Sequence, residues 1–226
     1  MKKILWTVTF IPLMITLFLV RYLPDKIPGH YDAMGNIDRW GSKYEILIMP
    51  IVIIFMTAFW HILIWKFENS IKKSSDDKII KGLKSNIKVL YIAAYLMLLQ
   101  FFAIHMFFVY SAFESTDETK VMVVDINYVM NIMIGIVLVI FGNYLPKTRR
   151  NSLVGFRTYI TMKSEQNWKK CNKFAGIVMM IAGIVIIFLS LIFGEKMSTI
   201  LMILVILLAL TVSLLYASKC DEGEKE

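Results

Sequence analysis

The densest group of side chains that could bind a charged partner lies between Gly142 and Gly176. Its eight basic residues are Lys147, Arg149, Arg150, Arg157, Lys163, Lys169, Lys170 and Lys173, against one acid, Glu165. Gly155 favours a turn that presents Arg157 outward. A guanidinium can form paired hydrogen bonds with a carboxylate or a phosphate. The stretch is therefore suited to an anionic partner, to lipid headgroups, or to holding the orientation of the chain by charge alone.

Local signals predict how the backbone carries these side chains. Pro146 ends the apolar run before it, because proline cannot continue a helical hydrogen-bond ladder. Ser164 is a typical N-cap residue, and Glu165 follows in the first turn, where the helix dipole favours negative charge. One face of the expected helix is formed by Trp168, Cys171, Asn172 and Ala175. This helical spacing predicts a helix that lies at a membrane surface and runs into the next span.

A second stretch with binding potential runs from Pro24 to Lys43. Its two prolines and three glycines rule out a long helix and favour consecutive turns. The candidate recognition residues are His30, Asp38, Arg39 and Trp40. Charged groups beside a rigid indole ring offer a partner both hydrogen bonds and apolar area. We expect either a structural cluster of turns or a surface that recognises a peptide.

Neither stretch carries a catalytic or metal-binding motif. The spacing of Asp32, Asn36 and Asp38, without a terminal glutamate, rejects an EF-hand. The sequence contains no HExxH, GxSxG or P-loop motif. Cys171 and Cys220 have no histidine at a ligand-like spacing. We therefore expect a protein that is not an enzyme and needs no metal or cofactor.

The elements that must position both stretches are membrane spans. Of the 226 residues, 58% are hydrophobic and 19% charged, which gives more apolar surface than a soluble fold of this size can bury. The apolar runs suggest six spans at about 4–22, 46–66, 88–112, 122–145, 172–193 and 198–217. Each can cross the ~30 Å hydrocarbon layer as a helix. Since a helix satisfies its own backbone in lipid, we expect an all-α, polytopic bundle of about six transmembrane helices. The first run has no small-residue cleavage site and is read as a retained span.

Basic residues between the spans are distributed unevenly. Nineteen of the 25 Lys and Arg residues fall on one side of the expected bundle and six on the other. Because positive residues stay in the cytoplasm, both termini and the basic stretch should be cytosolic. Cys171 and Cys220 would then be in a reducing compartment, where no disulfide is expected. The formal net charge of +8 therefore indicates contact with anionic lipid rather than with nucleic acid.

The division of the chain follows from these spans. Residues 1–70 hold spans one and two with the external stretch, and residues 71–121 hold the third span and its connectors. Residues 122–217 hold spans four to six with the basic loop 146–173, and residues 218–226 form a charged cytosolic tail. The lysine-rich connector 66–88 is expected to be a solvated loop that touches anionic headgroups. The acidic connector 114–125 is its external counterpart.

Polar residues inside the spans are the remaining functional candidates. They are His61, Gln100, His105, Asp125, Asn127, Asn131 and Asn143. Asn127 and Asn131 share a helical stripe with Gly135 and Gly142, a pattern typical of close helix packing with hydrogen bonds of ~0.6–2 kcal/mol each. We prefer this packing role to a proton or ion pathway, because no intramembrane acid–base pair emerges.

The order of residues in the basic stretch resembles the SdpI family of bacterial integral-membrane proteins. The resemblance rests on Gly142-Asn143, Pro146-Lys147, Asn151, Gly155-Phe156-Arg157-Thr158, Thr161-Met162, Glu165, Trp168 and residues 172–176. Tyr159-Ile160 departs from the Pro-Trp that is usual in the family. The external stretch resembles the DUF1648 region often found ahead of such segments, through Leu-Pro-x-x-Ile-Pro-x-His and Gly-x-x-Asp-x-Trp-Gly-Ser-Lys.

The resemblance implies a function that composition does not reveal. The best-known family member protects its host against a secreted killing peptide and also holds a transcriptional repressor at the membrane. It implies partner-binding residues in the cytosolic loop at Asn151, Gly155, Arg157, Thr158, Glu165 and Trp168. An immunity or sensor protein in the bacterial cell membrane is thus the first hypothesis. The alternatives are a small transporter or channel, and an assembly partner that acts through the basic loop.

Overall fold

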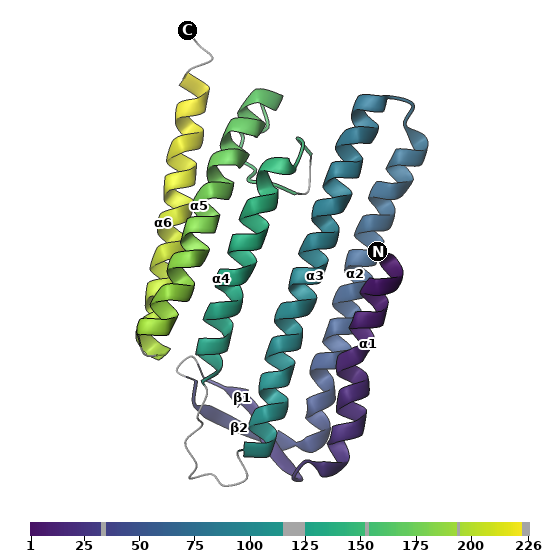
Figure 1. The fold of residues 1–226 in the computed structure, drawn as a ribbon, viewed down its shortest axis with the longest axis vertical. Coiled ribbons are helices and arrows are strands. Elements are labelled where there is room, and N and C mark those ends of the chain that lie inside the picture. Colours follow the sequence, from purple (N-terminus) through teal and green to yellow (C-terminus); the bar gives the residue numbers. More distant parts are fainter. Residues whose placement is uncertain (33–34, 115–124, 152–153, 194, 223–226) are drawn as a thin grey trace.

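Six long helices and one hairpin make up the described chain. The computed structural model describes residues 1–32, 35–114, 125–151, 154–193 and 195–222. The helices run along the long axis of the molecule (Figure 1) and are α1 (Lys2–Leu19), α2 (Ile48–Lys73), α3 (Asp77–Glu114), α4 (Ile126–Tyr144), α5 (Glu165–Ile192) and α6 (Glu195–Glu222). Each contains a segment long and apolar enough to cross a membrane. The expected all-α, polytopic membrane protein is therefore confirmed.

The helices form two groups. In the first, α2 packs against both α1 and α3, and in the second, α5 packs against both α4 and α6. Contacts between α3 and α4 join the groups (Figure 1). Only 11% of the apolar segment of α6 is buried against the rest of the protein, so most of this helix is left for contact with lipid.

Two pairs of glycines bring the backbones of α4 and α5 together. A Cβ on Gly176 would lie 2.5 Å from the carbonyl oxygen of Gly142, and one on Gly183 would lie 2.5 Å from that of Gly135. Both pairs are seven residues apart on their own helices, so they recur on the same face after two turns. Close approach of this kind is typical of small residues in membrane helix interfaces. The glycine stripe expected on the fourth span thus meets a matching stripe on the fifth.

The connector between the second and third spans is not a solvated loop. Helix α2 continues to Lys73 and α3 begins at Asp77, which leaves only residues 74–76 outside the helices. The expectation of a loop over residues 66–88 is therefore wrong. Lysine and isoleucine can continue a helix even in a segment that is too charged to lie in the membrane. Asp76 Oδ1 caps α3 by accepting a hydrogen bond from the Ile79 amide at 3.3 Å. The acidic connector 114–125 lies almost entirely outside the described residues.

The external stretch folds as a β-hairpin rather than as consecutive turns. Strands β1 (Lys26–Tyr31) and β2 (Ile37–Ser42) pair antiparallel, with irregular register around His30. A two-stranded hairpin consists only of edges, so Pro28 can lie in β1 without breaking a central ladder. At the tip, Gly35 has a φ of +81°, which a glycine adopts without strain. Prolines and glycines therefore shape the hairpin instead of preventing it.

The hairpin lies across the ends of both helix groups. Ile27 is 1% exposed and packs in a cluster with Leu23, Ile46, Val109 and Ala112. The Tyr31 hydroxyl is hydrogen-bonded to Ser111 of α3. At the tip, a Cβ on Gly35 would overlap the carboxylate of Asp125, which caps α4 through the amide of Asn127. The hairpin thus contacts α3 and the start of α4 together.

The two candidate stretches lie at opposite ends of the bundle. Figure 1 shows the chain between α4 and α5 at the end to which the C-terminus and the α2–α3 connection also point. The hairpin lies at the other end of the bundle. Successive connections thus lie at alternate ends of the bundle, and the side of the membrane that each end faces stays a prediction.

Candidate functional site: a basic loop and an opposing hairpin

The basic loop, residues 146–173, runs from the end of α4 into the first turns of α5, as its sequence predicts. Helix α4 ends at Tyr144 and a short 3-10 helix follows over Leu145–Lys147, with Pro146 inside it. Ser164 is the N-cap of α5, and its Oγ accepts a hydrogen bond from the Asn167 amide at 3.0 Å. Helix α5 then continues without a break to Ile192. Its first turns therefore extend the span rather than lying flat on a membrane surface.

Trp168 is the centre around which the loop folds. Its side chain is completely buried, and its indole N–H donates to the Thr148 carbonyl at 3.1 Å. Gly155 lies against the ring with a φ of +139°, and a Cβ there would come within 2.4 Å of two ring carbons. The sequence analysis put Trp168 among the partner-binding residues. The structure instead buries it, because the loop closes over the ring.

Two asparagines satisfy the loop backbone. The Asn172 amide accepts from the Phe156 N–H at 2.7 Å and donates to the Phe156 carbonyl at 3.3 Å. The Asn151 side chain donates to the carbonyls of Arg149 and Val154 and accepts from the Val154 N–H at 2.7 Å. Buried backbone groups need such partners outside regular secondary structure. Asn151 is therefore placed to hold the loop closed, and Asn172 to anchor the loop to α5.

Arg150 and the Thr158–Thr161 turn complete the framework. The Arg150 guanidinium donates to the carbonyls of Met162 and Lys163, both at 3.0 Å, and lies 3.8 Å from Glu165. The Thr158 amide donates to the Thr161 hydroxyl at 2.8 Å, and the Thr161 amide donates to the Thr158 hydroxyl at 3.2 Å. Glu165 and Thr158, both sequence candidates for partner binding, are thus held within the loop. Sequence reasoning did not single out Arg150, whose role depends on carbonyls that only the fold brings near.

Arg157, like Glu165, is an exposed member of the predicted set. Its side chain lies on the surface as expected, and within the described chain no acid pairs with it. Tyr159, where the sequence departs from the family pattern, is 81% exposed, and its ring centroid lies 4.9 Å from Lys163 Nζ. These side chains offer a cationic and aromatic surface to a partner or to headgroups.

The outer face of the hairpin brings the four external candidates close together. His30 Nδ1 and Asp38 Oδ1 are 2.7 Å apart on neighbouring strands, with both side chains exposed. Arg39 donates to the Gly29 carbonyl at 3.0 Å and pairs with Glu45 at 2.8 Å. Trp40 lies opposite Pro28 and is half-buried. His30, Asp38 and Trp40 are therefore available on the surface, while Arg39 already ties the hairpin to the start of α2.

Burial and charge act on two groups beside the hairpin. Burial raises the pKa of Tyr31, which keeps its hydroxyl protonated as it contacts Ser111. A hydrogen bond from Lys43, 2.8 Å away, lowers the pKa of the exposed Asp25. Neither shift brings a group toward neutral pH.

Polar side chains inside the spans mostly contact other helices. His105 is completely buried and bonds through Nε2 to the Thr16 hydroxyl at 2.7 Å. His61 Nδ1 accepts from the Trp6 indole at 3.0 Å. Asn131 donates to Ser198 and Thr199 of α6, both at 3.1 Å. These are contacts between helices of the kind expected for packing.

Two of the polar candidates lie outside such contacts. Asn143 is exposed and Gln100 is half-buried, and no side-chain hydrogen bond joins either to another described residue. Elsewhere in the described chain, the thiols of Cys171 and Cys220 are neighbours across α5 and α6, and both are free. No three His, Cys, Asp or Glu side chains of the described residues gather to hold a metal ion.

The fold and its two ends define a polytopic membrane protein with six spans, a hairpin at one end and a buttressed basic loop at the other. Comparison with known proteins shows what the chain is similar to. Residues 147–217 match the SdpI/YfhL protein family, and residues 7–54 match a domain of unknown function, DUF1648. The chain is 28% identical over 200 residues to the protein named Immunity protein SdpI of Bacillus subtilis (strain 168), covering 88% of this chain and 86% of that protein. No solved structure matches the chain. The resemblance to the SdpI family, with an N-terminal DUF1648 region, is therefore confirmed.

Proposed function

We propose that this chain is a membrane immunity protein that protects its cell against a secreted toxic peptide. The observation that carries the proposal is its similarity, along 88% of its length, to a protein named for immunity. The similarity covers both the hairpin region and the basic loop, so both candidate sites lie within the part of the chain that resembles that protein. Immunity requires no chemistry on a substrate, which agrees with the absence of catalytic motifs from the sequence.

The proposal includes an orientation for the two ends. Nineteen of 25 basic residues belong to the two termini, to residues 66–88 and to the basic loop. We infer that this end is cytosolic and that the hairpin faces outward, in the cell membrane of a bacterium. The hairpin would then meet a secreted peptide first. Its outer face, with His30, Asp38 and Trp40, is the surface we assign to recognition.

The basic loop supports a second, cytosolic step. By family resemblance, we propose that a transcriptional repressor is held at the membrane through this loop. Arg157 is the side chain best suited to such a partner, because it is exposed and has no acidic partner within the described chain. The framework of Trp168, Asn172 and Arg150 would keep it in place.

A killing assay tests the main proposal. Cells that lack this chain would be exposed to secreted peptides of the host, with the chain expressed from a plasmid or with an empty plasmid. We expect survival to depend on expression of the chain. Equal killing of both strains by every host peptide, with the protein present in the membrane at normal abundance, would contradict an immunity function.

A further inference from the structure

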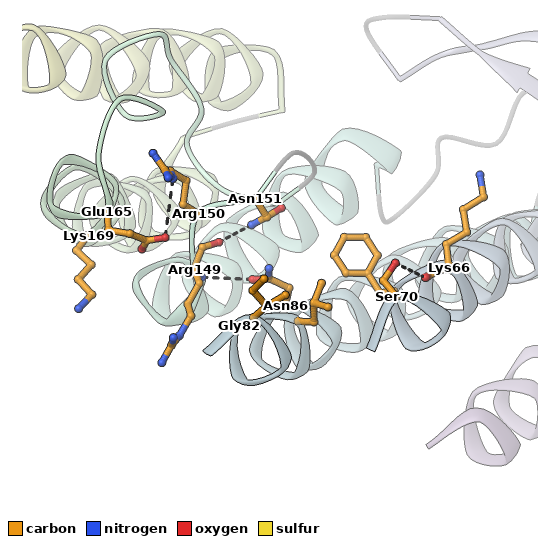
Figure 2. Close-up of a pocket in the computed structure, with 12 residues that line it drawn as sticks. Lys66, Ser70, Gly82, Asn86, Arg149, Arg150, Asn151, Glu165 and Lys169 are labelled. Carbon is orange, nitrogen blue, oxygen red and sulfur yellow. Dashed lines mark hydrogen bonds and ion pairs between the residues drawn. The ribbon is translucent and has the colours of Figure 1, made fainter. Parts of the chain in front are cut away.

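A groove opens between the two helix groups at the end that carries the basic loop. It has a volume of about 840 Å³ and is lined by side chains of α2, α3, α5 and the basic loop (Figure 2). Figure 2 shows Arg149 and Lys169 on one side of the groove and Lys66 of α2 on the facing side. The immunity proposal does not use this groove.

The wall between α3 and the loop is fixed by hydrogen bonds. The Ser85 hydroxyl donates to the Lys147 carbonyl at 2.6 Å, and the Arg149 amide donates to the buried Asn86 side chain at 3.3 Å. Gly82 lets the Arg149 side chain pass over α3, because a Cβ there would lie 3.3 Å from Arg149 Cδ. These contacts fix the backbone at Arg149, whose side chain lines the groove.

The groove has an excess of positive charge. Arg150 and Glu165 lie 3.8 Å apart and offset each other. Lys66, Arg149 and Lys169 have no acidic partner among the residues that the structure describes, and all three side chains are exposed. Three unpaired cations around one opening favour an anionic ligand.

The boundary between the two helix groups, here called the seam, continues below the cations and is lined there by apolar side chains. A second hollow of about 370 Å³ is lined by Phe59, Trp60, Leu63, Leu90, Phe141 and Val154, with Ala93 and Gly155. Trp60 precedes Lys66 by six residues on α2, which is ~9 Å along a helix. The second hollow is therefore deeper in the membrane than the cations, on the same seam.

We propose that this seam binds one anionic phospholipid. Its phosphate would contact Arg149 and Lys169, and Lys66 would add positive charge on the facing side of the groove. One acyl chain would lie along Trp60, Leu90 and Phe141. A soluble anion would use the cations but leave the apolar hollow empty, and a zwitterionic lipid would leave the positive charge unbalanced. Only a ligand with a net negative headgroup above a hydrocarbon chain matches both parts.

Binding of defined lipids to the purified full-length protein tests the proposal. The protein in a neutral detergent would be titrated with phosphatidylglycerol, phosphatidylcholine or glycerol 3-phosphate, with retained lipid read by native mass spectrometry and stability by thermal unfolding. We expect phosphatidylglycerol to bind and to raise the unfolding temperature, and the other two to do neither. Equal binding of both lipids would overturn the proposal, and binding of glycerol 3-phosphate as tight as that of the lipid would reduce the site to a phosphate site.

Matched variants separate the groove from general surface charge. Arg149→Gln with Lys169→Gln should weaken phosphatidylglycerol binding about tenfold or more, since each basic residue near a membrane surface contributes ~1 kcal/mol. The control, Lys170→Gln with Lys173→Gln, removes two exposed charges of α5 that do not line the groove, and should bind normally. Equal losses in the two double variants would contradict a specific site.

A third variant tests the apolar part while leaving every cation in place. Ala93→Phe fills the deeper hollow and should reduce binding of phosphatidylglycerol with long acyl chains. A short-chain phosphatidylglycerol is the control for this variant, because its binding depends less on the hollow and should fall less when the hollow is filled. Unchanged binding of the long-chain lipid by a folded Ala93→Phe protein would remove the acyl chain from the hollow and overturn the proposal.

Discussion

Gly155 and Trp168 constrain each other's identity. The glycine needs its positive φ and has no room for a Cβ, while the indole needs the loop above it to stay buried. The sequence indicated the turn at Gly155, the cap at Ser164 and the buried face of α5, because each depends on neighbours within one or two turns. It could not indicate that Trp168 is covered by Gly155, since that contact depends on how a loop folds back over a helix.

Replacing Gly155 with alanine should destabilise the loop. The new Cβ would meet the Trp168 ring at 2.4 Å in a backbone conformation that L-residues rarely adopt, at a cost of about 1–3 kcal/mol. Thermal unfolding and proteolysis of the purified protein measure the change. Tyr159→Ala, at an exposed site in the same loop, is the control and should unfold like the parent. A Gly155→Ala protein as stable as this control would mean that the loop relaxes freely.

Replacing Arg157 with lysine distinguishes a partner site from a lipid anchor. A point charge serves a headgroup nearly as well, whereas paired hydrogen bonds to a carboxylate or phosphate need the planar guanidinium. We expect Arg157→Lys to leave membrane abundance unchanged and to impair function in the survival assay and in a reporter of repressor activity. Full activity at normal abundance would assign Arg157 to lipid contact alone.

At the scale of elements, the apolar runs predicted all six spans but not their extensions. Helices α2 and α3 continue beyond the hydrocarbon layer because helix formation there needs no further apolar residues, so hydropathy does not register it. The hairpin was missed for a related reason. Prolines and glycines are common both in turn clusters and in edge strands, and only docking of Ile27 and Tyr31 against α3 selects the strands.

The contact between α4 and α5 should be intolerant of side chains. A Gly176→Leu substitution would force the helices apart, since even a Cβ lies 2.5 Å from the Gly142 carbonyl oxygen. We expect a strong fall in membrane abundance and a lower unfolding temperature. Gly82→Ala is the matched control, because its nearest neighbour is the movable Arg149 side chain, and alanine favours a helix by ~1 kcal/mol. Similar losses in both variants would show that helix packing is not the cause.

The outer face of the hairpin can be tested without disturbing its inner face. Asp38→Ala and Trp40→Ala should weaken protection against the toxic peptide at normal abundance, because both side chains lie on strand β2 away from the Ile27 cluster. Tyr44→Ala, an exposed aromatic residue just beyond the hairpin, is the control and should protect fully. Survival equal to the parent in both hairpin variants would make the hairpin purely structural.

At the scale of the whole molecule, the orientation in the membrane is the central prediction. Native Cys171 is only 1% exposed, so it is a poor reporter of sidedness. In a protein without native cysteines, Asn36→Cys should react with an impermeant thiol reagent on intact cells. Lys163→Cys should react only after the cells are permeabilised. Both positions are exposed, so the reverse labelling pattern would invert the orientation.

Helix α3 also touches both candidate surfaces. Ser111 bonds to the hairpin through Tyr31, and Ser85 and Asn86 bond to the start of the basic loop. Ser111 follows Ser85 by 26 positions on one unbroken helix, which is a length of ~39 Å at 1.5 Å per residue. A partner that displaced the hairpin would therefore move α3, the same helix that contacts the start of the basic loop. A single helix bridges the two ends of the bundle, so no relay of intervening side chains is needed to couple them.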